Sequence, residues 1–256
     1  MQESSDQSID QRKTPKIWVL TLFPNHFKEF ISTGVIGRLF SDKSVEIECL
    51  YLGDFSPKSF KGVDGTPYGG GPGMVMRADV LKACLDEVIN LGGYKNPKED
   101  LEVIYTAPRG KVFNNNDAHE LKEKFIERER DLVFICGRYE GIDERFIESY
   151  VDQIYSIGDF VLSGGELAVQ CIIDSLCRFL PSALGNDQSA AQDSFEDGLI
   201  EGPIYTKPRD FEGKEVPKEL LSGNHKLIKS YNEAKKVEYT KKYRPDLYNE
   251  YRKTKS

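Results

Sequence analysis

Residues 135–146 read ICGRYEGIDERF, and residues 155–167 read YSIGDFVLSGGEL. Each stretch lies at the end of a short apolar run, at 131–136 and at 153–157, whose branched and aromatic side chains predict a buried β-strand. Both runs stop in a glycine-rich segment that carries polar side chains. One such segment alone is often a tight turn that needs glycine for its backbone angles. Two in succession, with the third described below, indicate a ligand site, because ligands of open α/β sheets bind at the carboxyl ends of the strands.

The composition describes an ordinary globular protein of one large domain or two smaller ones: of its 256 residues, 39% are hydrophobic and 30% are charged. No apolar run approaches the roughly eighteen residues of a membrane span, so no membrane partner is expected. Five cysteines without a CxxC pair favour a reducing cytoplasm over a disulfide framework or a zinc site. The three histidines are scattered, so no metal site is predicted. Residues 1–15 are polar, which predicts a disordered tail rather than a secretion signal.

Strand and helix patterns alternate along the first two thirds of the chain. Strands are predicted at 16–23, 45–52 and 102–105; helices are predicted at 26–40, at 78–91, from a cap at Asn115 or Asn116 to about 129, and at 166–180. Such alternation is typical of an α/β fold with a parallel sheet. The strand at 102–105 ends in Thr106-Ala107-Pro108-Arg109-Gly110, which is the third polar loop at a strand end.

A glycine-rich loop, PYGGGPGM, spans residues 67–74. Four glycines in five positions forbid regular structure and let the backbone approach a ligand or partner closely. The loop is not a Walker A loop, because no Lys-Ser/Thr pair follows, and it does not match GxGxxG. A nucleotide-dependent kinase or dehydrogenase is therefore disfavoured. The loop is either a contact surface or a purely structural turn.

Residues 181–192 are small or polar without periodicity, which predicts a mobile linker between two domains. The segment Asp193-Ser194-Phe195 would cap the element that follows, and a smaller domain would extend from there. Residues 225–256 hold ten Lys/Arg and four Asp/Glu, a local charge of 10 − 4 = +6, which leaves −7 − 6 = −13 on the remainder. Such a tail is either the solvated face of a helix or a basic arm that meets a phosphate backbone.

Taken in order, the motifs LFPNHF, PYGGGPGM, YTAPRG, CGRYEGIDER, SIGDFVLSGGEL, DSF, YTKPRDFEGKEVP and LLSGNH strongly resemble those of the bacterial tRNA (guanine-N1)-methyltransferases of the SPOUT class. The resemblance covers residues 16–247. It implies an α/β domain at 16–181 with a deep trefoil knot, a rare exception to the rule that chains are not knotted. A flexible linker at 182–193 and a small, mostly α-helical, tRNA-binding domain at 194–256 would follow. The family works as a homodimer, with each active site built from both subunits.

The resemblance also implies that S-adenosylmethionine is the cofactor and that it binds in the knot. Its contacts would fall on the three strand-end loops: Tyr105, Thr106, Ala107 and Pro108; Gly137, Tyr139 and Glu140; and Ser156, Ile157, Gly158, Phe160, Leu162, Gly164 and Gly165. Glycines there would admit the cofactor, and backbone groups would read its adenine edge. The pattern of strand ends and the resemblance thus indicate the same place. Some members of the family depend on Mg²⁺, and no acidic cluster in this sequence predicts a site for it.

The implied reaction methylates N1 of guanosine 37 of tRNA, beside the anticodon. The family's general base matches Asp193, which would remove the N1 proton, and its cation matches Arg178, which would stabilise the charge that develops on guanine O6. Without the resemblance, Asp193 is interpreted as a helix cap and Arg178 as the i, i+4 ion-pair partner of Asp174. The basic C-terminal domain would hold the anticodon stem-loop, and the further tRNA contacts would be Tyr68, Gly69, Gly70 and Ser194.

Two positions depart from the family pattern, and neither is the base or the cation. Gly65 replaces an aspartate before the glycine-rich loop, which leaves any substrate contact by that carboxylate open, and Ala168 replaces the proline that usually follows GGEL. Two alternative functions also stay open. One is a SPOUT methyltransferase that acts on a ribose 2′-OH or another base, and the other is a noncatalytic RNA-binding protein of the same fold.

Overall fold

The computed structural model of the chain describes residues 14–57, 62–180, 183 and 193–255. The chain forms two compact units, residues 1–185 and residues 186–256, whose positions relative to one another are not determined. Nearly all of the predicted tail and of the predicted linker at 182–193 lies outside the described residues. The predicted limits of the two domains and of the linker therefore stay predictions.

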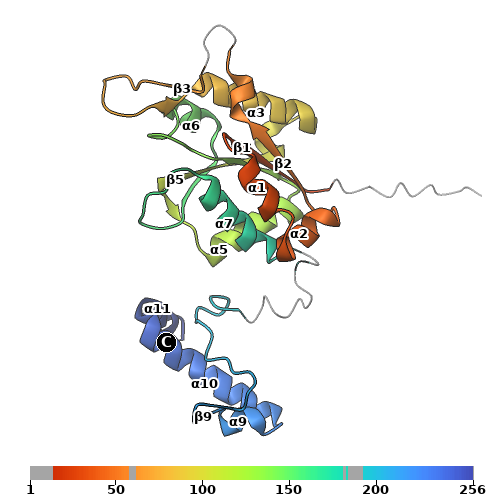
Figure 1. The fold of residues 1–256 in the computed structure, drawn as a ribbon, viewed down its shortest axis with the longest axis vertical. Coiled ribbons are helices and arrows are strands. Elements are labelled where there is room, and N and C mark those ends of the chain that lie inside the picture. Colours follow the sequence, from red (N-terminus) through yellow and green to blue (C-terminus); the bar gives the residue numbers. More distant parts are fainter. Residues whose placement is uncertain (1–13, 58–61, 181–182, 184–192, 256) are drawn as a thin grey trace, which may run out of the picture. The chain divides into compact units, whose positions relative to one another are not determined.

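A five-stranded parallel sheet forms the centre of the first unit (Figure 1). Its strands lie in the order β2 (Glu46–Tyr51), β1 (Lys16–Thr21), β6 (Asp131–Ile135), β5 (Leu101–Val112) and β7 (Gln153–Ser156), and every neighbouring pair is parallel. Strand β6 is buried along its whole length, as expected of a central strand that is covered on both faces. The predicted α/β fold with a parallel sheet is confirmed, and the trefoil knot stays a prediction.

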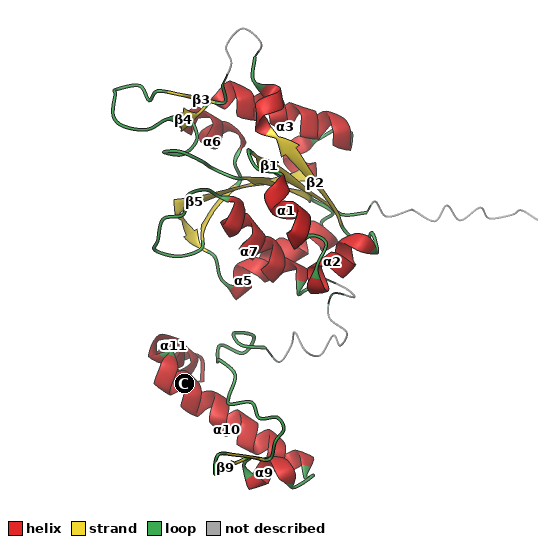
Figure 2. Ribbon diagram, in the orientation of Figure 1, coloured by secondary structure: helices red, strands yellow, loops and turns green. Residues whose placement is uncertain are grey.

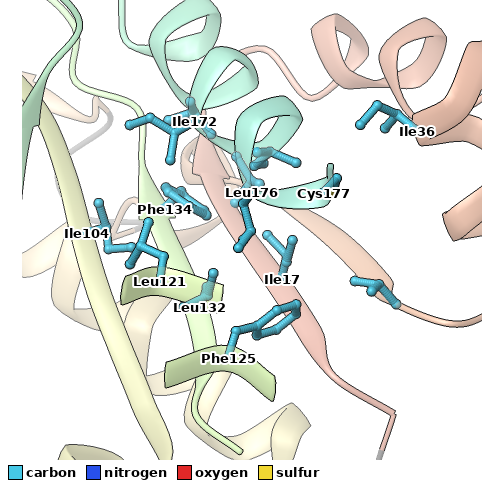
Figure 3. Packing of buried hydrophobic residues seen from close by; sticks show 14 of the residues in the cluster. Ile17, Ile36, Ile104, Leu121, Phe125, Leu132, Phe134, Ile172, Leu176 and Cys177 are labelled. Atoms are coloured by element: carbon cyan, nitrogen blue, oxygen red, sulfur yellow. The ribbon is translucent and has the colours of Figure 1, made fainter. Parts of the chain in front are cut away.

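Helices cover both faces of this sheet (Figure 2). One face carries α1 (Asn25–Phe30), α2 (Gly34–Ser41), α5 (Asn115–Lys122), the π-helix η2 (Glu123–Glu127) and α7 (Glu166–Cys177); the other carries α3 (Ala78–Gly92) and α6 (Glu144–Tyr150). Successive side chains of β1 enter different cores, because strand side chains alternate between faces. Ile17 joins Phe134 and Leu176 in the core beside α7, which Figure 3 shows, whereas Trp18 joins the core beside α3.

The prediction of a single helix at 26–40 is wrong, because α1 and α2 are separate helices. The chain turns between them at Gly34, whose φ of 66° lies in the left-handed region that glycine adopts without strain. Phe27 of α1 and Ile36 of α2 nevertheless enter the same core. The helical spacing of hydrophobic residues therefore continues across the turn, and for this reason the sequence pattern predicts one helix instead of two.

The N-cap of α5 is Asn114, one residue before the predicted caps Asn115 and Asn116. Its side chain accepts hydrogen bonds from the backbone N–H groups of Asn116 and Asp117, and the Asp117 side chain accepts one from the Asn114 N–H. This reciprocal pair is a capping box, which satisfies backbone donors that the helix itself leaves unpaired. The charged helix is also shorter than predicted and continues as η2.

Strand β5 continues beyond the predicted end at Tyr105. Its pairing with β7 is interrupted, since Thr106 and Lys111 both lie opposite Tyr155, and residues 107–110 are left over between them. Such an irregularity redirects the strand and its side chains. The third predicted loop is therefore a bulge within a long strand rather than the end of a short one.

Four shorter elements also lie among the described residues of the first unit: η1 (Leu52–Phe55), β3 (Asp64–Gly65), β4 (Val75–Met76) and α4 (Pro97–Asp100). Strands β3 and β4 are antiparallel and bracket the glycine-rich loop. The second unit contains the hairpin β8 (Asp210–Phe211) and β9 (Lys214–Glu215), followed by α9 (Lys218–Leu221), α10 (His225–Tyr243) and α11 (Pro245–Lys255). The expected helical C-terminal region is thus present.

Candidate active site

The three segments singled out in the sequence belong to neighbouring parallel strands: two are the loops after β6 and β7, and the third is the bulge within β5, which lies between them in the sheet. Together they surround a cavity of about 460 Å³ at the carboxyl edge of the sheet. All fourteen residues that the resemblance assigns to the cofactor line this cavity: Tyr105, Thr106, Ala107, Pro108, Gly137, Tyr139, Glu140, Ser156, Ile157, Gly158, Phe160, Leu162, Gly164 and Gly165. Their meeting at one place agrees with the expectation, and their binding of the cofactor stays a prediction.

Gly165 brings the loop after β7 into direct contact with the loop after β6. Its backbone N–H donates a 2.9 Å hydrogen bond to the carbonyl oxygen of Gly137. A Cβ atom on Gly165 would lie 2.7 Å from Thr106 Oγ1 and 2.9 Å from the backbone nitrogen of Gly137. Both distances are too short for real contacts, so the two loops can pack this closely only with glycine at this position.

Polar groups in the cavity wall are held by burial and by local hydrogen bonds. The Ser156 hydroxyl donates to the Gly158 carbonyl at 3.0 Å, which fixes the turn after β7. Burial raises the pKa of the Tyr105 phenol, so this side chain is neutral at physiological pH. The Thr106 hydroxyl is buried and has no hydrogen-bond partner among the described residues. A buried hydroxyl without a partner is uncommon and marks this part of the cavity wall as unusual.

The glycine-rich loop is joined to the cavity through its C-terminal end. The backbone N–H of Glu140 donates to the Met74 carbonyl at 2.9 Å, and the N–H of Met76 donates to the Gly141 carbonyl at 2.9 Å. Tyr68 is 98% exposed near the start of the loop. This geometry places the predicted tRNA contacts Tyr68, Gly69 and Gly70 on an exposed loop whose base is fixed to the cavity, outside the cavity lining itself.

The two predicted catalytic residues belong to different units of the structure. Arg178 directly follows the last residue of α7 in the first unit, whereas Asp193 belongs to the second unit. Ser194, a predicted tRNA contact, accepts a 3.0 Å hydrogen bond from the Glu201 N–H within that unit. The roles of Asp193 and Arg178 stay predictions, because the two units are not placed relative to one another.

The interpretation of the DSF segment as a helix cap is wrong. Phe195 has a φ of 80° and donates its backbone N–H to the Leu199 carbonyl at 2.7 Å, which makes the segment a turn. Among the residues described after it, the first helix is α9, which begins only at Lys218. Asp193 therefore does not cap a helix among the described residues, and its catalytic role stays a prediction.

Charged residues in the cavity wall were missed by the sequence reasoning. The guanidinium of Arg109, in the bulge of β5, forms two contacts of 2.7 and 3.1 Å with the carboxylate of Glu144 at the start of α6. Arg138 also lines the cavity and pairs with Glu166. These two arginines and two glutamates all lie within the quoted motifs. Their place in those motifs was the one signal in the sequence that could have identified them as site residues. Across the part of the chain that the structure describes, no group of three or more His, Cys, Asp or Glu side chains could hold a metal ion.

Both α10 and α11 of the second unit carry several lysines and tyrosines. Lys242 lies 4.7 Å from the ring centroid of Tyr243, and Lys255 lies 5.7 Å from that of Tyr251. Cations over aromatic rings offer both charge and stacking faces, which suits contacts with RNA. None of the described helices has the length and apolar character that a membrane crossing would require.

Residues 15–250 match the family model described as tRNA (Guanine-1)-methyltransferase TrmD. A tRNA (guanine-N(1)-)-methyltransferase of Sulfurihydrogenibium sp. (strain YO3AOP1) is 45% identical over 232 residues, which cover 91% of this chain and 87% of that protein. One of Lachnospira eligens is 43% identical over 234 residues, covering 91% and 94%, and one of Clostridium tetani is 42% identical over 240 residues, covering 94% and 95%. Since the family model covers nearly the whole chain and these relatives are 42–45% identical to it, this chain belongs to the tRNA (guanine-1)-methyltransferase TrmD family.

Proposed function

We propose that this chain transfers a methyl group from S-adenosylmethionine to N1 of guanosine 37 of tRNA. The observation that carries the proposal is the single cavity at the sheet edge, lined by all the expected cofactor residues, in a chain of this methyltransferase family. The names of the similar proteins state guanine N1 as the methylated atom. Position 37 comes from the resemblance.

The residues around the cavity fit S-adenosylmethionine. The volume of about 460 Å³ falls in the usual range of roughly 300–1,000 Å³ for small-molecule sites. Gly137 and Gly165 let the wall segments pack closely, because a Cβ atom on either would collide with a neighbouring residue of the wall. When bound, S-adenosylmethionine supplies a methyl group on a positively charged sulfur, which is already activated for transfer. The protein's contribution is therefore to hold the reactants in line and to manage the proton on N1.

In the proposed reaction, Asp193 is the general base that accepts the N1 proton of guanine. A base must come within hydrogen-bond reach of the proton it removes, and this contribution is typically worth about 10²–10⁴ in rate. Loss of that proton leaves negative charge on guanine O6, which the Arg178 guanidinium offsets with up to two donors. The base belongs to the second unit and the cofactor residues belong to the first, so tRNA binding would complete the site.

The proposed substrate complex follows the family. The chain works as a homodimer with a knotted cofactor site, and the anticodon stem-loop lies on the basic helices α10 and α11. Tyr68 on its exposed loop provides a stacking surface for a splayed base, and Gly69, Gly70 and Ser194 make further tRNA contacts. A tRNA substrate places the reaction in the cytoplasm. Mg²⁺ is an optional cofactor for which no site is proposed.

Transfer of labelled methyl from S-adenosylmethionine to tRNA transcripts, followed by nucleoside analysis, tests the proposal. We expect 1-methylguanosine with guanosine 37 and none after its replacement by adenosine. Asp193→Asn should lose about a hundredfold or more in rate, whereas Asp42→Asn, which removes an exposed charge elsewhere, should behave as the parent. Label on a ribose 2′-OH would overturn the proposed methylation of guanine N1. Full turnover by Asp193→Asn would overturn the proposed role of Asp193 as the general base.

A further inference from the structure

We propose that Arg138 and Glu166 are positioning residues for the cofactor: their ion pair holds the loops after β6 and β7 in the arrangement that forms the cavity. The inference rests on the proposed function and deepens it. Arg138 lies in the motif CGRYEGIDER and Glu166 in SIGDFVLSGGEL, and neither of these two residues has been given a role so far. We call them the Arg138–Glu166 pair.

The Arg138–Glu166 pair spans two segments of the cavity wall. Arg138 follows β6, and Glu166 is the first residue of α7, directly after the Gly164-Gly165 turn. Arg138 Nη2 lies 2.8 Å from Glu166 Oε2, and Arg138 Nε donates to Oε1 at 3.3 Å. Arg138 Nη1 also donates to the Ser163 carbonyl oxygen at 3.0 Å. One rigid guanidinium therefore binds the turn through its backbone and the helix through its side chain.

The end of β1 supports the pair from a third side. The Thr21 hydroxyl donates to Glu166 Oε1 at 2.8 Å, and the Phe23 ring centroid lies 4.3 Å from Arg138 Cζ. The Glu166 side chain is only 2% exposed. Among the described residues, its Oε2 accepts no well-oriented hydrogen bond, so the adjacent guanidinium is the charge that offsets it. Removal of Arg138 would leave a buried carboxylate without its cation, an arrangement that strongly destabilises its surroundings.

Gly164 shows that the cavity wall is built around the arginine. A Cβ atom on Gly164 would collide with Arg138 Nε and Cζ. With the guanidinium held where it is, the turn can pass over it only with glycine at this position. Ser163, Gly164 and Gly165 all line the cavity, so the pair determines where this part of the wall lies. A wall that is fixed before the ligand arrives binds more tightly than one that the ligand must order.

An exposed pair in the same segment offers a matched control. Arg145 Nη2 lies 2.7 Å from Asp143 Oδ2, but the Arg145 side chain is 74% exposed. Solvent-exposed pairs of this kind contribute little. Arg145 is also absent from the cavity lining. Like Arg138→Gln, Arg145→Gln therefore removes one positive charge, but at a position that does not line the cavity.

The test is the affinity of the full-length protein for S-adenosylhomocysteine, the product left after methyl transfer, measured by calorimetry together with the melting temperature. We expect Arg138→Gln to weaken binding about tenfold or more, Arg138→Lys to recover part of it, and Arg145→Gln to stay within about twofold of the parent. In turnover, KM for S-adenosylmethionine should rise more than kcat falls. In a cycle with Glu166→Gln, the double variant should lose less than the two single losses combined.

Parent-like affinity in Arg138→Gln would overturn the inference, as would additive losses in the cycle or a fall in kcat with unchanged affinity. If Arg138→Gln does not fold, Arg138→Lys and Glu166→Gln decide by the same measurement, since both keep a polar group in place. A parent protein that binds neither S-adenosylhomocysteine nor S-adenosylmethionine would instead refute the proposed function itself. The two failures are therefore distinguishable.

Discussion

Replacement of Gly165 by alanine examines whether the close contact between the cavity loops is required for cofactor binding. The added Cβ atom would lie 2.7 Å from Thr106 Oγ1, 2.9 Å from Cys136 Cα and 2.9 Å from the Gly137 nitrogen. Two of these three atoms belong to the backbone, so no side-chain rotation relieves every contact. The φ of −78° at Gly165 suits alanine, and the effect is therefore steric rather than conformational.

The magnitude follows from the cost of overpacking. An extra methyl group in a well-packed region costs about 1–3 kcal/mol. Thr106 and Gly137 line the cavity, so their displacement changes the site itself. If the whole cost appears in binding, Kd for the cofactor rises by about fivefold to a hundredfold, since each 1.4 kcal/mol is a factor of about ten.

Calorimetric titration with S-adenosylhomocysteine, with the melting temperature recorded in parallel, measures this effect. Gly65→Ala is the matched control, because a Cβ atom there meets no atom within 4 Å and φ is not in the left-handed region. The control should keep the parent affinity. An unchanged Kd in Gly165→Ala would refute the reasoning, and a lower melting temperature with unchanged Kd would assign the contact to stability alone.

Three further variants or reagents test other features of the first unit. Ellman's reagent should label the exposed Cys171 in the native protein and the buried cysteines only after unfolding, because burial raises the pKa of their thiols and the thiolate is the reactive form; early labelling of all five would contradict this. Arg130→Met should lower the free energy of unfolding in urea by about 1–3 kcal/mol, because Glu102 is 1% exposed and its Oε2 lies 2.8 Å from the Arg130 guanidinium. Asn114→Ala should cost about 1 kcal/mol by the same measurement through loss of the capping box, and an equal loss in Asn116→Ala would argue against it.

The loops that line the cavity could be predicted because the sequence signals for them lie within a few residues of each other. The run at 131–136 is apolar and ends at Gly137, so the strand and its loop are both visible in a few residues. Parallel pairing then requires the loops after β5, β6 and β7 to lie at one edge, whatever the details of each turn. Predictions failed where distant contacts decide the structure. Strand β5 passes its predicted end because Lys111 pairs with Tyr155, a partner 44 residues away (155 − 111).

The Arg138–Glu166 pair shows the same limit within the site. Arg138 lies among exposed polar residues of its motif, and Glu166 opens a helix, where an acidic residue is common for local reasons. Nothing nearby in the sequence indicates that the two side chains meet, because the contact depends on the turn between them passing over the guanidinium. The two glycines before Glu166 are the only trace, and they permit many turns.

The division of the chain into two units separates the cofactor cavity from the proposed general base. Every residue that lines the cavity belongs to the first unit, whereas the proposed base Asp193 belongs to the second. Cofactor affinity should therefore depend on the first unit alone, and methyl transfer on both. Asp193→Asn should bind S-adenosylhomocysteine as the parent does while it loses turnover, and Gly165→Ala should do the opposite, losing affinity more than turnover at saturating cofactor. A common loss of affinity in both variants would mean that the base also contributes to the cofactor site.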